Sequence, residues 1–334
     1  MNIIIPMAGM GKRMRPHTLT VPKPLIPIAG KPIVQRLVED IAKVCNESID
    51  NIGFVIGRNF GKEVEGDLKE IASQVGGTGH IFYQDEALGT AHAIMCAEEI
   101  LIGNTVVAFA DTLFKADFKL DATKDGIIWV QQVEDPSAFG VVKLNDNNEI
   151  TEFVEKPDTF VSDLAIIGIY YFKDGDYLKS ELKYLLDNNI TDKGEFQLTD
   201  ALESMKVKGT KFVPGKVTEW LDCGNKNATV NTNQRYLEFI KDQKLVADSA
   251  TIENSVVIPP CYIGEGAIVK NTVIGPHVSL GDHSVIEDSI VKNAIIQTNS
   301  KIDNANIANS MVGNFVTLEG RPQDVSIGDY NTVN

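Results

Sequence analysis

The stretch Asn2–Pro16, with the sequence NIIIPMAGMGKRMRP, sets the pattern of the fold. Its apolar run up to Ile5 is short and has no basic segment before it, so we expect a buried strand and not a signal peptide. Glycines and basic residues follow at once. Such a loop is typical of the carboxyl end of a strand in a doubly wound sheet, where ligands bind.

The order of strand and amphipathic stretch continues to about residue 240. Short β-rich runs alternate with stretches in which apolar residues return every three or four positions. Strands are expected at 3–5, 52–56, 106–110 and 127–130, and helices at 33–44, 62–74 and 90–100. This alternation predicts an α/β fold with a doubly wound, mixed but mostly parallel sheet covered by helices.

A different rhythm begins after about residue 248. A branched apolar residue recurs every five or six positions and is often followed by glycine. A helix needs a spacing of 3.6 and an ordinary strand a spacing of 2, so the pattern predicts a parallel β-helix, with plain antiparallel strands as the alternative. The anchors are Ile252, Ile258, Ile263, Val269, Ile274, Leu280, Ile286, Val291, Ile296, Ile302, Ile307 and Val312.

These two rhythms predict two domains. The first comprises residues 1–245 and the second, the β-helix, residues 246–334. The link from Phe239 to Asp248 is expected to be the end of a helix that leads into the β-helix.

Composition argues against several classes of function. Acidic residues outnumber Lys and Arg by 46 to 31, which gives a net charge of −15, the wrong sign for a nucleic-acid partner. No apolar stretch approaches the roughly 18 to 20 residues of a membrane span, so no membrane partner is expected. Cys45, Cys96, Cys223 and Cys261 have no paired spacing and are interpreted as reduced thiols of a cytoplasmic protein.

An anionic ligand must therefore bind where a few cations and backbone amides gather. In the loop Ala8–Pro16, glycines let backbone amides approach a phosphate, while Arg13 and Arg15 add charge. The loop lacks the Gly-Lys-Ser/Thr ending of a P-loop and the third glycine of a dinucleotide fingerprint. Lys23 lies between two prolines, which present it from a stiff segment.

Together these motifs resemble the signature of sugar-1-phosphate nucleotidylyltransferases, in particular the glucose-1-phosphate thymidylyltransferases and uridylyltransferases. The signature is Gly9-x-Gly11-x-Arg13-x-x-Pro16-x-Thr18 followed by Pro22-Lys23-Pro24-Leu25. Further blocks match in the family's order, and that order is more specific than any one block. They are Gln84-x-x-x-Leu88-Gly89-Thr90-Ala91, Phe139-Gly140-Val141-Val142, Glu155-Lys156-Pro157, Ala165-x-x-Gly168-Ile169-Tyr170, Glu195-Phe196-Gln197-Leu198-Thr199-Asp200-Ala201 and Trp220-Leu221-Asp222-x-Gly224.

The resemblance implies a Rossmann-like nucleotidyltransferase domain followed by a short left-handed β-helix of hexapeptide repeats. It also implies an Mg²⁺-dependent enzyme that joins a nucleoside triphosphate to a sugar 1-phosphate and releases pyrophosphate. Arg13 would hold the outgoing β- and γ-phosphates, Lys23 the α-phosphate, and Lys156 the sugar phosphate. Asp111 and Asp222 would hold the metal ion. The nucleotide site would consist of Ala8, Gly9, Gly11, Gln84, Gly89 and Thr90, and the sugar pocket of Gly140, Glu155, Lys156 and Ile166.

The chemistry of the reaction agrees with this set of residues. Transfer at phosphorus requires positioning and neutralisation of charge, and Mg²⁺ prefers carboxylate oxygens together with substrate phosphates. The attacking phosphate has a second pKa of about 6, so it needs no general base, and the absence of a catalytic His or Ser motif is expected. As structural alternatives, Asp111 is a turn residue and Trp220 with Asp222 a core pair. Thr199 and Asp200 are expected to cap the following helix.

Three positions in the nucleotide site depart from the family's usual pattern. Met10 stands where a second glycine is usual and Lys12 where threonine is usual, which leaves the geometry around the base and the triphosphate open. Asp111 follows Ala110 where the family usually has glycine.

The sugar pocket departs in a way that bears on the substrate. Ile166 stands where members that use N-acetylhexosamines or mannose often have asparagine, whereas glucose-type enzymes tend to be apolar there. Glucose 1-phosphate is therefore the expected acceptor. The nucleotide remains dTTP or UTP, because the methyl group that separates thymine from uracil is worth only about 1 kcal/mol.

Two other functions remain as alternatives. The β-helix of some relatives also transfers an acetyl group, and consumption of acetyl-CoA with an amino-sugar phosphate would identify such a bifunctional enzyme. A catalytically silent regulatory homologue would bind a nucleotide-sugar only, but such proteins typically lose one of the residues that here are Arg13, Lys23, Asp111 and Asp222. For the β-helix itself we expect a role in a homo-oligomer, because stacked coils offer flat edges for contacts between subunits.

Overall fold

The computed structural model describes residues 1–9, 11–116, 119–321, 324, 326–327 and 330. The chain forms two compact units. The first comprises Met1–Ile26 and Pro32–Asn225, and the second Pro27–Lys31 and Lys226–Asn334. Residues 27–31, a short hairpin turn, thus pack with the β-helix and not with the first unit. So does the helix that follows Asn225. The functional boundary at residue 245 stays a prediction.

A nine-stranded mixed sheet forms the centre of the first unit. Its parallel part has the order β6-β1-β4-β5. Strand β11 pairs antiparallel with β6 on one side and with β8 on the other, and so connects the parallel part to the remaining strands. Ile4 of β1 is fully buried between its neighbours in the sheet. The strands are β1 (Asn2–Pro6), β4 (Asn51–Ile56), β5 (Thr78–Tyr83), β6 (Thr105–Ala108), β8 (Gly126–Gln132), β9 (Val141–Leu144), β10 (Ile150–Val154), β11 (Leu164–Phe172) and β12 (Phe212–Lys216). The predicted α/β class is confirmed.

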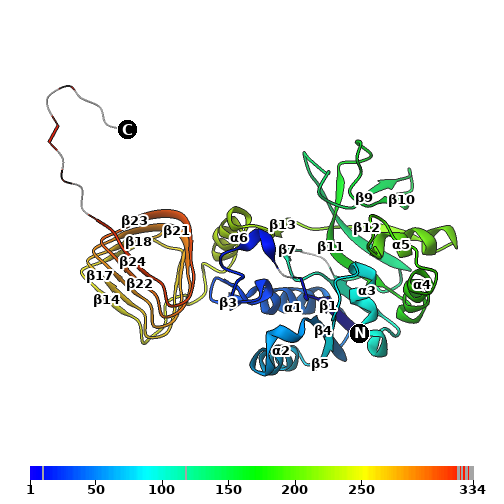
Figure 1. Cartoon of the computed structure of the whole chain (residues 1–334), viewed down its shortest axis with the longest axis horizontal. Coiled ribbons are helices and arrows are strands. Elements are labelled where there is room, and N and C mark those ends of the chain that lie inside the picture. The colour runs from blue at the N-terminus through cyan, green and yellow to red at the C-terminus, as the bar shows by residue number, and fades with distance from the viewer. Residues whose placement is uncertain (10, 117–118, 322–323, 325, 328–329, 331–334) are drawn as a thin grey trace. The chain divides into compact units, whose positions relative to one another are not determined.

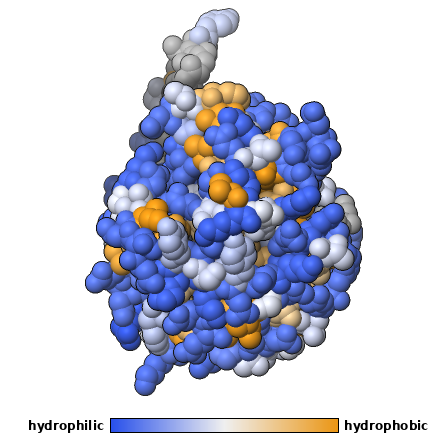
Figure 2. Space-filling view, turned by 90° about the vertical axis from the view of Figure 1, so that its right-hand side faces the viewer, coloured by the Kyte–Doolittle hydropathy of each residue, from blue (hydrophilic) through white to orange (hydrophobic). Residues whose placement is uncertain are grey.

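Helices cover both faces of the parallel strands, with α1 and α2 on one side and α3 and α4 on the other (Figure 1). The second side holds a continuous apolar core in which Ile4 packs with residues of α3, α4 and α5. The helices of this unit are α1 (Ile33–Val44), α2 (Lys62–Gln74), α3 (Thr90–Met95), α4 (Gly175–Asp187) and α5 (Leu198–Val207). On the face of the first unit seen in Figure 2, hydrophilic residues predominate and hydrophobic ones form small separate groups.

Two predicted elements of this unit end early. The helix expected at 90–100 stops at Met95, because the Ala97 N–H donates to the carbonyl of Ile94 and tightens the turn, and a 3₁₀ turn, η4 (Glu98–Ile100), follows. The strand expected to reach Ala110 ends at Ala108. The residues after it turn into a separate two-stranded sheet, β7 (Thr112–Lys115) with β13 (Glu219–Asp222).

The second unit contains a parallel β-helix, as the spacing predicts. Its coils stack in a five-stranded and a six-stranded sheet whose pairs are all parallel. The anchors from Ile263 to Ile302 lie inside it, whereas Ile252 and Ile258 of the first coil are 40% exposed. The strands are β14 (Thr251–Glu253), β15 (Val256–Val257), β16 (Cys261–Ile263), β17 (Ile268–Lys270), β18 (Val273–Ile274), β19 (Val278–Leu280), β20 (Val285–Glu287), β21 (Ile290–Ile296), β22 (Lys301–Asp303), β23 (Asn306–Val312) and β24 (Thr317–Glu319).

Helix α6 (Lys226–Phe239) leads into the β-helix but ends at Phe239, so the helical link expected up to Asp248 is wrong. Past residue 240 the chain turns, and Val246 forms a parallel bridge with Ile263 of the first coil. Among the described residues, no helix is both long enough and apolar enough to cross a membrane.

A tight turn in the second unit connects β2 (Pro27–Ile28) to β3 (Lys31–Pro32). Both central residues have positive φ, 49° at Ala29 and 86° at Gly30. The Ala29 N–H donates to the Oδ1 atom of Asn233 in α6 (2.9 Å), and the Ser279 hydroxyl in the β-helix donates to the same atom (2.7 Å). The turn, α6 and the β-helix therefore meet at one fully buried side chain.

Candidate active site

Two adjoining cavities open where β1, β5 and β6 of the first unit end. The larger, of about 580 Å³, is lined by the loop after β1 and by residues that follow β5 and β6. The smaller, of about 240 Å³, is lined by residues of β11 and β13 and by the segments next to β9 and β10. Arg13, Thr90, Phe109 and Asp111 line both cavities, so the two form one cleft.

The loop after β1 needs its two glycines for different reasons. At Gly11 φ is 56°, and a Cβ atom would lie 3.0 Å from the Cβ of Lys23, so a side chain is disfavoured by the protein itself. At Gly9 a Cβ would meet no described atom within 4 Å. The space over Gly9 is open and lies in the larger cavity, where a ligand can approach the backbone. Met10 lies outside the described residues.

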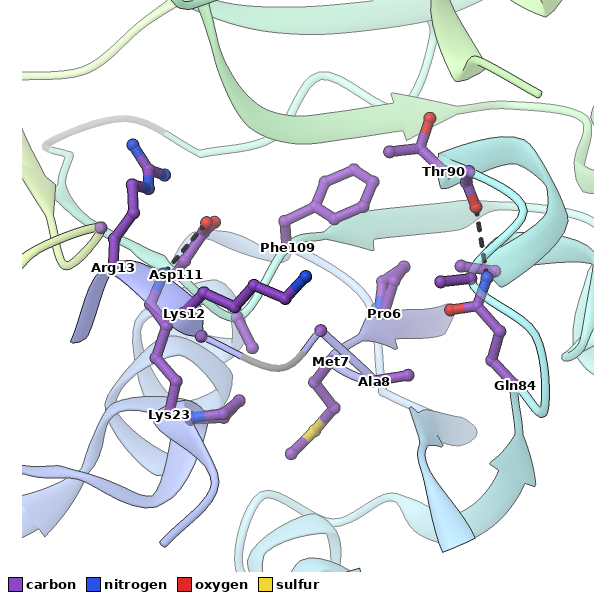
Figure 3. A pocket seen from close by; sticks show the side chains of 18 of the residues that line it. Pro6, Met7, Ala8, Lys12, Arg13, Lys23, Gln84, Thr90, Phe109 and Asp111 are labelled. Carbon is purple, nitrogen blue, oxygen red and sulfur yellow. Dashed lines mark hydrogen bonds and ion pairs between the residues drawn. The ribbon is translucent and has the colours of Figure 1, made fainter. Parts of the chain in front are cut away.

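Two cations and two aspartates converge at the junction of the cavities. Lys23 is only 8% exposed, and its Nζ atom lies 3.1 Å from the Oδ2 atom of Asp111 (Figure 3). Asp222 is brought beside Asp111 by the pairing of β7 with β13, and the Cys223 N–H donates to the Asp111 carbonyl (3.0 Å). Burial raises the pKa of Asp222, the Gly224 N–H lowers it, nearby Asp111 raises it, and Lys23 and Arg13 lower it. Arg13, Lys23, Asp111 and Asp222 are therefore close enough to influence one another electrostatically.

The aspartate pair fits a hard divalent cation. Burial and the nearby Asp111 carboxylate both raise the pKa of Asp222, and a bound cation would stabilise the charged form of this carboxyl group. Within the described part of the chain, no three His, Cys, Asp or Glu side chains gather as metal ligands. Two carboxylates leave most of a coordination sphere to substrate oxygens and water, which is the usual arrangement for Mg²⁺ and not for zinc.

Gln84, Gly89 and Thr90 form one wall of the larger cavity, on the side opposite Arg13 (Figure 3). Gly89 has a φ of 112°, and a Cβ there would lie 2.4 Å from the carbonyl oxygen of Phe196, so only glycine fits. The Gln84 amide donates to the Gly89 carbonyl (3.3 Å), and the Thr90 hydroxyl accepts from the Leu198 N–H (2.8 Å). The first bond stabilises the wall itself, and the second holds it to the start of α5.

The smaller cavity has a mixed polar and apolar lining. Gly140 forms part of its wall, and a Cβ there would lie 3.0 Å from the Glu155 carboxylate and 3.3 Å from Ile166. The Trp220 ring packs edge-on against Phe139, with ring centroids 5.1 Å apart, and its indole nitrogen is buried. The cavity is therefore bounded by residues from many separate segments of the first unit.

Most of the predicted site residues meet in this cleft. The larger cavity gathers Ala8, Gly9, Gly11, Arg13, Lys23, Gln84, Gly89, Thr90 and Asp111, and the smaller one Gly140, Glu155, Ile166 and Asp222. Lys156 lines neither cavity. It has a positive φ of 37°, it is half-exposed, and its Nζ atom pairs with Glu155 at 3.2 Å.

The sequence interpretation placed some side chains wrongly or left them out. Thr199 does not cap α5, which has Gln197 at its N-cap and no side-chain cap, but lines the smaller cavity and donates to Glu155 (3.4 Å). Trp220 contacts Phe139 but also lines the cavity, so it is not solely a core residue. Phe109, Glu195 and Gln197 were not singled out, although the last two lie in a quoted block.

Charge is unevenly divided between the cavities. Lys12, Arg13 and Lys23 line the larger one with two carboxylates, whereas Arg13 lines the smaller one with three, those of Asp111, Glu155 and Asp222. In a chain with a net charge of −15, the larger cavity is thus a local site for an anion.

Known proteins share this fold and sequence. Residues 2–238 match the family model described as nucleotidyl transferase. The bifunctional protein GlmU of Methanocaldococcus jannaschii is 31% identical over 264 residues, which cover 77% of this chain and 60% of that protein. The catalytic subunit beta of mannose-1-phosphate guanylyltransferase from Drosophila melanogaster is 33% identical over 350 residues, 99% of this chain and 91% of the relative.

A solved structure is also similar. It is a UDP-glucose pyrophosphorylase in complex with UDP-glucose, with a TM-score of 0.58 and 25% identity, over 71% of this chain and 98% of that one. The chain spans 60% of the length of the bifunctional relative, so the similarity leaves much of that protein unmatched.

Proposed function

The chain belongs to the nucleotidyl transferase family, and we propose that it transfers a nucleotidyl group from a nucleoside triphosphate to a sugar 1-phosphate. The observation that carries this proposal is the convergence of Arg13, Lys23, Asp111 and Asp222 at the junction of two cavities. The larger cavity, with its three cations, suits a triphosphate, and the smaller cavity suits a sugar. Their junction is then the place of the reacting phosphates.

The reaction needs little from the protein beyond placement and charge. An oxygen of the sugar phosphate forms a bond to the α-phosphorus, and the bond from that phosphorus to the bridging oxygen of the β-phosphate breaks, which releases pyrophosphate. The buried Lys23 is held by Asp111 and would neutralise charge at the α-phosphate, while Arg13 would bind the leaving group. The attacking phosphate is mostly dianionic at pH 7, so no side chain has to remove a proton.

Asp111 and Asp222 are the residues that would hold Mg²⁺. The ion would supply neutralisation of the triphosphate charge and alignment of its oxygens. The exposed Lys156, beside Glu155 at the smaller cavity, is in a position to meet the sugar phosphate as it enters.

We propose glucose 1-phosphate as the acceptor and dTTP or UTP as the donor. Ile166 is buried and offers no hydrogen bond to an N-acetyl group, which supports an unsubstituted hexose. The similar UDP-glucose pyrophosphorylase supports a pyrimidine and glucose. The guanylyltransferase relative supports GTP and mannose 1-phosphate, which are therefore the pair to test against.

A bifunctional enzyme is the second candidate, because a bifunctional protein is among the relatives. The similarity covers only 60% of that relative, so the other 40% of its length is unmatched. This unmatched part weakens the argument that the chain has a second activity. Consumption of acetyl-CoA with glucosamine 1-phosphate would support it.

Pyrophosphate release tests the proposal directly. We expect release that requires Mg²⁺, the triphosphate and the sugar 1-phosphate together, and that stops when the metal ion is chelated. Asp111→Asn should lower turnover by about 100-fold or more while the protein stays folded. Near-normal turnover of that variant would remove Asp111 from the metal site, and no turnover by the wild type would leave a nucleotide-binding homologue.

A further inference from the structure

The cleft holds one cation to which the proposed mechanism assigns no task. Lys12 lines the larger cavity, and Figure 3 shows its side chain extended across that cavity, in a direction away from Arg13. Among the residues that the structure describes, the side chain of Lys12 makes no hydrogen bond and no ion pair, and only its backbone carbonyl has a partner, the Arg15 N–H. Its ammonium group is exposed to the cavity and its charge is not offset by a carboxylate.

The other cations of the site all lie near carboxylates. Lys23 pairs with Asp111 at 3.1 Å and Lys156 with Glu155 at 3.2 Å. Arg13 and Asp222 lie close together, since a Cβ at Gly224 would lie 3.3 Å from the Arg13 guanidinium and 2.9 Å from the Asp222 carboxylate. Each of these charges is partly neutralised within the protein, so Lys12 is the cation whose charge is most available to an anionic ligand.

We propose that Lys12 binds the β- and γ-phosphates of the nucleoside triphosphate together with Arg13. This inference rests on the proposed function. Both side chains leave the same short turn, η1 (Lys12–Met14), whereas the buried Lys23 comes from a separate segment and is tied to Asp111. The β- and γ-phosphates carry most of the triphosphate charge, so an additional flexible ammonium group stabilises them more than it stabilises the α-phosphate.

This role predicts a selective effect on ligands. The triphosphate and pyrophosphate contain the two phosphates that Lys12 would contact, whereas the nucleotide-sugar product contains neither of them. Loss of Lys12 should therefore weaken the binding of the triphosphate and of pyrophosphate and leave the binding of the nucleotide-sugar unchanged. If Lys12 only added positive charge to the surface, its loss would weaken the binding of all three anions to the same extent.

The test uses the full chain and compares Lys12→Met, Lys12→Arg and Lys69→Met. Lys69 is exposed on α2, so its loss removes the same charge outside the cleft. For Lys12→Met we expect KM for the triphosphate, and KM for pyrophosphate in the reverse reaction, to rise about 5- to 30-fold. KM for the nucleotide-sugar should stay within about twofold, as should all three values in Lys69→Met, and Lys12→Arg should recover most of the loss.

Binding of Mg²⁺-pyrophosphate, measured by calorimetry, separates this inference from the proposed function. If the wild type binds pyrophosphate but turns over no substrate pair, the proposed function fails while a weaker affinity in Lys12→Met still supports the site. Equal pyrophosphate affinity in Lys12→Met and the wild type overturns the inference. So does an equal loss of affinity for pyrophosphate and for the nucleotide-sugar.

Discussion

At the scale of single residues, the sequence identified most side chains of the cleft because each lies in a motif of fixed spacing. It could not show the reason for each glycine. Gly9 has open space where its Cβ would be, whereas a Cβ at Gly11 would press on Lys23. Glycine is thus required by the fold at position 11, whereas at position 9 we propose that the bound nucleotide requires it. Thr199 was misread for a similar reason, because only the packing against Glu155 reveals its place in the cavity.

The two glycines make a matched pair of substitutions. Gly9→Ala should leave the free energy of unfolding within about 0.5 kcal/mol of the wild type, while KM for the triphosphate rises about tenfold because the backbone can no longer approach the phosphates. Gly11→Ala should cost about 1 to 3 kcal/mol, since alanine is strained at the φ of 56° and crowds Lys23. Denaturant unfolding and steady-state kinetics measure the two effects. A large loss of stability in Gly9→Ala would contradict this division.

At the scale of elements, α1 and α2 have the bounds that periodicity predicts, whereas the segments after α3 and α6 do not. A tightened turn after Met95 and an early end at Phe239 depend on single hydrogen bonds and on packing, which periodicity does not encode. The turn at Ala29 and Gly30 was not foreseen either. The turn lies only a few residues after Lys23 in the chain, and α6 begins a few residues after Asp222.

Gly30 tests how the packing of this turn contributes to stability. A Cβ at Gly30 would lie 2.3 Å from the ring of Tyr262, whereas at Gly61, which has nearly the same φ, it would meet nothing within 4 Å. Gly30→Ala should therefore destabilise the protein by about 2 kcal/mol more than Gly61→Ala does. We also expect Gly30→Ala to lower kcat/KM, because a displaced turn would shift the chain only a few residues after Lys23. Thermal unfolding and kinetics decide, and equal effects of the two variants would show that the contact with Tyr262 does not hold the turn.

At the scale of the whole molecule, the change of rhythm near residue 248 predicts the two kinds of architecture but not the way the chain divides between them. The second unit also includes residues 27–31 and α6, because Asn233 binds both the turn and the β-helix. Contacts between residues more than 200 positions apart leave no local signal in a single sequence.

Assembly through the β-helix stays a prediction at this scale. Val256, Val273 and Ile290 stack in register across one sheet, and the first and last are 56% and 50% exposed. A second copy of the chain is the occupant that we expect there. Light scattering should then give a mass above the 36.5 kDa of one chain, and Val256→Lys with Ile290→Lys should reduce it to that of a monomer with turnover retained. A monomeric wild type would contradict this expectation.

The central claim is that the cleft joins a triphosphate to a sugar 1-phosphate. The most direct measurement is pyrophosphate release with Mg²⁺ over a grid of the nucleoside triphosphates and common sugar 1-phosphates. We predict the highest kcat/KM for glucose 1-phosphate with dTTP or UTP. A higher value for mannose 1-phosphate with GTP would contradict the assigned substrates, and release no faster than background for every pair would contradict the claim itself.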